Sequence, residues 1–138
     1  MSAKSSPKIL LVDDDRFYTR LLVRMLAKIG ITDVEVAQHG EEALTHILNG
    51  AQQGSPEHQL IILDINMPFM TGWELLDKLE NLVSFTKNPV PIVMVTTSRN
   101  EDDKFKASEH KLVKEFLVKP VSELTLLNMV QSHLKYTG

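Results

Sequence analysis

The sequence contains no cysteine, which excludes disulfide bonds and thiol chemistry. It has no apolar run near the ~20 residues needed to cross a bilayer, and residues 1–7 lack the apolar core of a secretory signal. The net charge of -3 gives no electrostatic reason to expect nucleic-acid binding. These absences predict a cytoplasmic protein with neither a membrane nor a nucleic acid as partner.

The residues that are present indicate one globular domain. The chain has 138 residues, of which 43% are apolar and 24% charged, and this composition suits a single folded core. We find no repeat and no second domain. We therefore expect a disordered tail over residues 1–7 and one domain over residues 8–138.

Strand and helix patterns alternate along the chain. Short apolar runs predict strands at 8–12, 33–37, 60–63, 92–95 and 115–118. Helical periodicity predicts helices at 16–29, at 40–49, from 73 to about 82, at 100–109, and after Ser122. On this pattern Phe17 and Leu21 face inward from the first helix, and Leu124 does so from the last. We expect an α/β fold: a doubly wound, five-stranded parallel sheet with helices on both faces.

Four of the predicted strands end in residues that can do chemistry. Asp13 and Asp14 follow the first strand, Asp64 the third, Thr96 the fourth and Lys119 the fifth. Because the carboxyl ends of parallel strands share one edge, these side chains should meet in one shallow crevice.

This combination of residues suits the transfer of a phosphoryl group. Clustered carboxylates repel one another unless a cation joins them, and Mg²⁺ prefers such oxygen ligands together with phosphate oxygens. A lysine adds a positive charge for a phosphoryl oxygen, and a threonine adds a hydroxyl. We therefore expect Asp64 to accept a phosphoryl group, a step that needs no separate general base.

The motifs resemble the receiver domain of response regulators, the CheY-like proteins. The resemblance covers the chain from about Lys8 to the last helix. It is carried by the sequences Leu11-Val12-Asp13-Asp14, Asp64-Ile65-Asn66-Met67-Pro68 with Gly72, Val95-Thr96 and Lys119-Pro120. It implies the flavodoxin-like strand order 2-1-3-4-5 and a cis bond before Pro120.

The resemblance also implies a role for each matching residue. Asp64 looks like the phosphoacceptor, and Asp13, Asp14, Asp64 and the Asn66 main-chain carbonyl look like the Mg²⁺ ligands. Thr96 looks like the switch hydroxyl, Lys119 like its phosphoryl-binding partner and Phe116 like the switch aromatic residue. The phosphodonor would be a phosphohistidine on a sensor histidine kinase or a histidine phosphotransfer protein, and the output an unidentified protein target. The chain would then be a signalling domain with only self-catalysed phosphorylation and dephosphorylation, and not otherwise an enzyme.

Several alternatives stay open at the level of sequence. Asp15 either caps the first helix or reaches the metal through water. Residues His39, His46, His58, His110 and His133 lack ligand spacing, and we expect all five to be surface or packing residues. A phosphorelay shuttle and a phosphorylation-independent adaptor remain alternative functions. A dehalogenase-type phosphatase would need a second aspartate where Asn66 stands, and Asp13 to Asp15 would repel the phosphate of a flavin.

Overall fold

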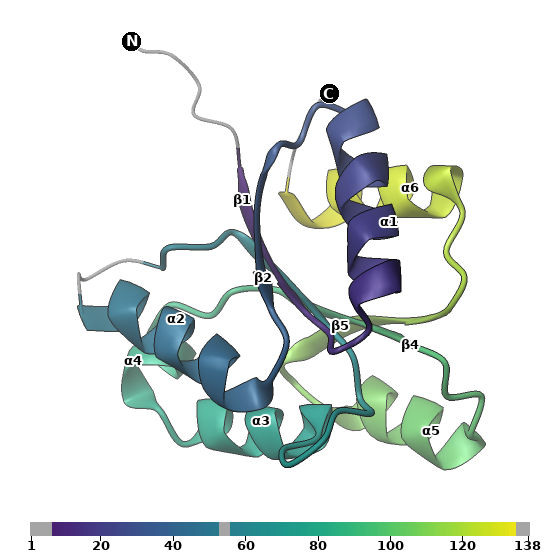
Figure 1. Ribbon diagram of the computed structural model, residues 1–138. Helices are drawn as coiled ribbons and strands as arrows, with labels where there is room; N and C mark the ends of the chain where they lie inside the picture. The colour runs from purple at the N-terminus through teal and green to yellow at the C-terminus, as the bar shows by residue number, and fades with distance from the viewer. Residues whose placement is uncertain (1–6, 53–55, 135–138) are drawn as a thin grey trace, which may run out of the picture.

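The computed structural model describes residues 7–52 and 56–134, and its main element is a parallel sheet (Figure 1). Five strands pair in the order β2-β1-β3-β4-β5, which confirms the predicted order. They are β1 (Lys8–Val12), β2 (Asp33–Ala37), β3 (Leu60–Leu63), β4 (Ile92–Thr96) and β5 (Val113–Val118). The helices are α1 (Arg16–Lys28), α2 (Gly40–Gln52), α3 (Gly72–Glu80), α4 (Val83–Lys87), α5 (Glu101–Glu109) and α6 (Glu123–Leu134). Of the predicted disordered tail, all but Pro7 lies outside the described residues.

Two apolar clusters cover the two faces of the sheet. Helices α1 and α6 lie side by side on one face, while α2, α3, α4 and α5 cover the other (Figure 1). The central strands β1, β3 and β4 alternate their side chains between these clusters, so they are buried on both sides. No helix in the described parts of the chain is long and apolar enough to span a bilayer.

Hydrogen bonds continue the pairing of the strands beyond their carboxyl ends. The amide of Asp64 donates to the carbonyl of Val12 at 2.9 Å, and the amide of Lys119 donates to the carbonyl of Thr96 at 2.8 Å. The backbone that carries the polar residues is therefore held in register with the sheet. The peptide bond between Lys119 and Pro120 is cis, as the family resemblance implies.

The prediction of which side chains of α1 and α6 face the core was partly wrong. Phe17 is 88% exposed and Leu21 is 45% exposed, because the buried stripe of α1 is centred on Leu22 and Leu26. At about 100° per residue, Phe17 lies opposite Leu26 on the helix. Leu124 is 67% exposed for a similar reason.

Helix α6 shows the same shift of its buried face. Its buried residues are Leu126, Met129 and Val130, and Leu124 lies about 160° from Leu126 around the helix axis. The predicted capping residue of this helix is in place, since the Ser122 hydroxyl accepts a hydrogen bond from the Thr125 amide at 3.1 Å.

Helix α4 was not predicted, and two helix ends differ from expectation. The helix after β3 ends at Glu80 instead of reaching Leu82, and α4 follows with Phe85 buried in the core. A five-residue helix is too short to show a helical period. Helix α2 runs on to Gln52, so the predicted polar loop from residue 49 is shorter, and residues 53–55 of it lie outside the described residues.

Gly72 fixes the loop that follows Asp64. Its amide donates to the carbonyl of Ile65 at 2.8 Å, and a Cβ on Gly72 would lie 2.5 Å from the Asp64 carbonyl oxygen. The loop therefore closes on itself only with glycine at this position. Within it, Phe69 has a φ of 70° and an exposed side chain.

The substitution Gly72→Ala should destabilise the protein, since the contact is with rigid backbone. We expect a loss of about 1–3 kcal/mol in the free energy of unfolding, the usual range for overpacking. Gly40→Ala is the matched control, because Gly40 also begins a helix but its Cβ would meet the flexible side chain of Met70. Urea unfolding of both variants should show the larger loss for Gly72→Ala, and equal losses would contradict this explanation.

Candidate functional site

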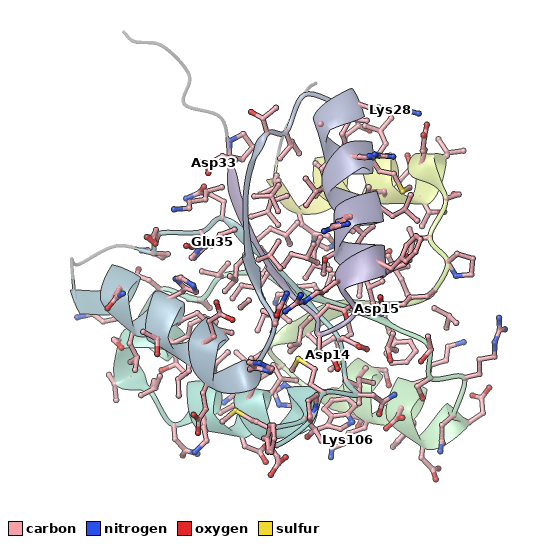
Figure 2. The ribbon with its side chains drawn as sticks, in the orientation of Figure 1. Asp14, Asp15, Lys28, Asp33, Glu35 and Lys106 are labelled. Carbon is pink, nitrogen blue, oxygen red and sulfur yellow. The ribbon has the colours of Figure 1, made fainter. Side chains whose placement is uncertain are left out.

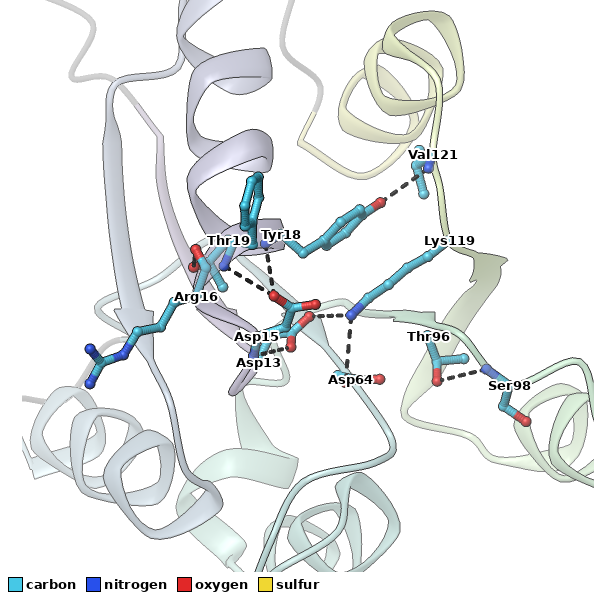
Figure 3. A network of polar contacts seen from close by, with 11 residues as sticks. Asp13, Asp15, Arg16, Tyr18, Thr19, Asp64, Thr96, Ser98, Lys119 and Val121 are labelled. Carbon is cyan, nitrogen blue, oxygen red and sulfur yellow. Dashed lines mark hydrogen bonds and ion pairs between the residues drawn. The ribbon is translucent and has the colours of Figure 1, made fainter.

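Four residues from four strand ends meet at the carboxyl edge of the sheet (Figure 3). Asp13, Asp64, Thr96 and Lys119 are each less than a tenth exposed, although three of them carry a charge. Charged groups are rarely buried unless they are paired. The predicted convergence of these side chains is therefore observed, and their charges must balance one another or a ligand.

Lys119 supplies the positive charge within this site. Its Nζ lies 2.7 Å from Asp13 Oδ2 and 3.6 Å from Asp64 Oδ2. The same ammonium lies 4.5 Å from the centre of the Tyr18 ring, a cation–π contact. Tyr18 is held in place because its hydroxyl accepts a hydrogen bond from the Val121 amide at 3.1 Å (Figure 3).

Sequence reasoning missed the contribution of Tyr18. Its contact with Lys119 joins α1 to the segment after β5, about 100 positions away in the chain. No local pattern reports such a contact, and Tyr18 stands only three residues after Asp15, within an ordinary amphipathic helix.

Burial and charge shift the pKa values of the central pair. Burial raises the pKa of Asp13, and the negative charge of Asp64 adds to the rise, against the lowering effect of the hydrogen bond from Lys119. For Lys119, burial alone would lower the pKa, but the bond to Asp13 and the charge of Asp64 outweigh it and raise the pKa. Lys119 is therefore an ammonium ion at neutral pH.

The carboxylates fit a hard divalent cation. Oxygen atoms of Asp13, Asp14 and Asp64 lie within 4.8 Å of one another, with Asp14 exposed to solvent. Asp64 Oδ1 is buried and has no hydrogen-bond partner among the described residues. An unpaired buried carboxylate oxygen beside two other carboxylates is a donor set suited to Mg²⁺.

Asp15 caps α1 and takes no direct part in this cluster. One of its carboxylate oxygens accepts hydrogen bonds from the amides of Phe17 at 3.0 Å and Tyr18 at 3.1 Å (Figure 3). Its own amide donates to Asp13 Oδ1 at 2.9 Å, which orients that carboxylate. Of the two interpretations left open by the sequence, the geometry supports the cap.

A chain of hydrogen bonds leads from Thr96 to the surface. The Thr96 hydroxyl oxygen accepts from the Ser98 amide at 3.2 Å, and the Ser98 hydroxyl donates to Asp103 Oδ2 at 2.7 Å. Asp103 Oδ1 in turn accepts from Trp73 Nε1 at 3.1 Å. The chain joins β4 to α5 and then to the start of α3, and the ammonium of Lys106 lies over the Trp73 ring.

Comparison with known proteins identifies the family. The family model of the response regulator receiver domain matches residues 9–131. The chain belongs to this family. Response regulator Rcp1 of Synechocystis is 35% identical over 136 residues, which cover 95% of this chain and 90% of Rcp1. Chemotaxis protein CheY1 of Helicobacter pylori is 30% identical over 119 residues, 86% of this chain and 90% of that protein.

Solved structures agree with the assignment. The Vibrio cholerae chemotaxis protein CheY4 is 31% identical and superposes with a TM-score of 0.75, over 94% of this chain and 99% of its own. A two-component response regulator from Cytophaga hutchinsonii has a TM-score of 0.84 over 96% of this chain and 100% of its own. At 24% identity that second match shows the fold alone.

The receiver domain thus brings together most of the residues that its sequence singled out. Asp13, Asp64, Thr96 and Lys119 form one buried group, and Asp14 joins them from the solvent side. Asn66 is exposed in the loop after β3.

The remaining predicted residue, Phe116, lies on the neighbouring strand β5. It is half-buried, pairs with Met94 of β4, and packs against the apolar cluster under α3 and α5. Thr97, the next hydroxyl along the chain, is exposed, whereas Thr96 is fully buried.

Replacing Lys119 by methionine would leave Asp13 and Asp64 buried without their cation. We expect Lys119→Met to lower the free energy of unfolding by about 3–5 kcal/mol in EDTA, as when other buried pairs lose one partner. Saturating Mg²⁺ should recover much of this loss, because the same carboxylates then regain a positive charge. Urea unfolding in both buffers measures the effect, with Lys114→Met, an exposed lysine of β5, as control. An equal loss in EDTA and Mg²⁺ would contradict the charge-balance explanation.

Proposed function

We propose that this receiver domain accepts a phosphoryl group on Asp64 from a phosphohistidine, in the cytoplasm, and thereby changes its affinity for a partner protein. The donor would be a sensor histidine kinase or a histidine phosphotransfer protein. The observation that carries the proposal is Asp64 itself, a carboxylate with one unpartnered buried oxygen and the other oxygen 3.6 Å from Lys119 Nζ. Family membership supports it.

The proposed reaction is a direct displacement at phosphorus. An oxygen of Asp64 attacks, the P–N bond of the phosphohistidine breaks, and the imidazole leaves with the electron pair of that bond. The product is an acyl phosphate, and the nucleophile needs no base because it is already a carboxylate. Two largely exposed aromatic side chains offer apolar surface to the donor protein. Phe17 lies in the segment after Asp15, and Phe69 lies in the loop after Asp64.

Residues of the chain supply the charge that the incoming phosphoryl group requires. Lys119 is held as an ammonium beside Asp64 by Asp13 and Tyr18, so its charge is in place before the donor binds. Mg²⁺ held by Asp13, Asp14, Asp64 and the Asn66 carbonyl would neutralise the carboxylates and polarise the phosphoryl oxygens. Self-catalysed loss of the group would use water at the same place.

The response to phosphorylation would pass through Thr96. Its hydroxyl oxygen already accepts from Ser98, so its proton is free to be donated to a phosphoryl oxygen. A move of Thr96 toward Asp64 would displace Ser98, whose amide is bonded to the Thr96 hydroxyl. The displacement would then reach Asp103 and Trp73 through the Ser98–Asp103 and Trp73–Asp103 hydrogen bonds. The half-buried Phe116 would then differ between the two states mainly in its burial.

Phosphorylation by a small donor tests the first step. Incubation with acetyl phosphate and Mg²⁺ should give an acid-stable, base-labile adduct detected by mass spectrometry of the intact chain. Asp64→Asn should abolish it, while Asp77→Asn, at an exposed position of α3, should not. No adduct, or an adduct that persists in Asp64→Asn, would overturn the proposal. Transfer of the group onward to a phosphotransfer protein would favour the shuttle.

The hydrogen-bond chain to Trp73 tests the second step. Trp73 is the single tryptophan, so its fluorescence should change when acetyl phosphate is added to the wild-type protein. Asp103→Ala removes the acceptor for both Ser98 and Trp73 and should greatly reduce this change without preventing adduct formation. Asp102→Ala, at the exposed neighbouring position, is the control. A full fluorescence change in Asp103→Ala would show that the coupling takes another route.

A further inference from the structure

A second group of ionisable side chains lies near the opposite, amino-terminal edge of the sheet. Glu35 of β2, His46 of α2, and Glu57 and His58 before β3 converge there. Figure 2 shows Glu35 on β2 well separated from Asp14 and Asp15 at the far end of β1. His58 is only 3% exposed, a degree of burial that a surface histidine would not show. The phosphorylation site makes no use of this group.

Glu35 links the two imidazole rings. Its Oε1 lies 2.8 Å from His58 Nε2, and its Oε2 lies 3.3 Å from His46 Nδ1. The two rings are 6.4 Å apart between centroids and nearly perpendicular, at 79°. A ligand atom from each of Glu35, Glu57 and His58 lies within 4.8 Å of the other two. Three potential ligand groups, those of Glu35, Glu57 and His58, thus point to one small volume. His46 adjoins it through the second oxygen of Glu35.

The chemistry of these groups differs from that of the acidic cluster. One imidazole with two carboxylates is a typical set of three zinc ligands, and zinc takes four N and O ligands at about 2.0–2.2 Å in a tetrahedron, with water able to fill the fourth position. Ligand atoms of such a site lie about 3.4 Å apart by that geometry, and those of the three groups here lie within 4.8 Å of one another. Imidazole favours zinc over magnesium, whereas oxygen ligands alone favour magnesium.

Lys8 occupies the position of a competing cation. Its Nζ lies 3.9 Å from Glu35 Oε1 and 3.6 Å from Glu57 Oε1. A lysine ammonium has a flexible four-carbon stem and is about a quarter exposed here, so it can swing into solvent. A divalent cation at the two carboxylates would then replace it at little structural cost.

We propose that Glu35, Glu57 and His58 form a binding site for Zn²⁺ that is separate from the phosphorylation site, with His46 positioning Glu35. Zinc there joins β2 to the segment before β3, and the contact of His46 with Glu35 links the site to α2. It would therefore hold the amino-terminal edge of the sheet together without contacting Asp64. The alternative is a purely structural network of ion pairs around His58, and the two interpretations make different predictions for metal binding.

Calorimetric titration with Zn²⁺ distinguishes the proposed zinc site from the phosphorylation site. The full chain is titrated at saturating Mg²⁺, both as wild type and as Asp64→Asn. We expect one equivalent of Zn²⁺ in both backgrounds. His58→Gln removes a ligand and should weaken binding by about 100-fold or more, whereas His46→Gln removes a partner of the ligand Glu35 and should weaken it by about 10–100-fold. Lys8→Met, which removes the competing charge, should tighten binding several-fold. His39→Gln is the matched control on an exposed histidine.

Titration with Co²⁺ adds a spectroscopic readout, since four-coordinate Co²⁺ has intense visible absorption bands and six-coordinate Co²⁺ does not. Glu57 is partly exposed, so Glu57→Gln serves as the ligand variant if His58→Gln fails to fold. The absence of a zinc equivalent, or the same affinity in Glu57→Gln as in wild type, would overturn the proposal and leave an ion-pair network. A zinc equivalent that disappears only in Asp64→Asn would assign the metal to the acidic cluster instead.

Discussion

The parallel direction of all five strands is the constraint on which the site depends. In a parallel sheet every strand ends at the same edge, so residues as far apart as Asp13 and Lys119 become neighbours at 2.7 Å. The pairing extends one residue past β1, β3 and β5, through the amides of Asp13, Asp64 and Lys119. Backbone hydrogen bonds of the sheet therefore fix the positions from which these side chains meet.

Burial strengthens the interactions among these charges. Two carboxylates and an ammonium in an apolar sheet interact strongly because little water screens them. The pKa of Lys119 is raised and the ammonium is kept charged by its neighbours, while burial raises the pKa of Asp13. Asp64 keeps one oxygen without a partner among the described residues. The same apolar layers that stabilise the fold thus enclose a group of charges that balance one another.

Much of the fold and site could be predicted from the sequence because the signals are local. Apolar runs such as Leu60 to Leu63 mark buried strands, and a polar residue directly after each run falls at the sheet edge. The contacts that the sequence did not reveal are those between distant segments. Tyr18 with Lys119, Asp103 with Trp73, and Glu35 with His58 each join different elements, and no spacing within one element encodes them.

The errors in predicting burial have a similar origin. Phe17 and Leu124 are apolar residues on otherwise amphipathic helices, and periodicity alone places them inward. The packing of α1 and α6 on the sheet decides which stripe of each helix is covered, and both residues lie outside that stripe. Such a choice depends on how the helix is rotated against its neighbours, which the sequence of the helix does not specify.

Strand β1 begins with Lys8 and continues directly into Asp13, so one short apolar segment separates two charged environments. Five residues of extended chain span about 16 Å. At that distance two unit charges interact by about 1 kcal/mol at an effective dielectric constant of about 20. A charge added at one end of β1 therefore changes the energy of a charge at the other end only slightly, and the length of the strand keeps the two charged groups nearly independent.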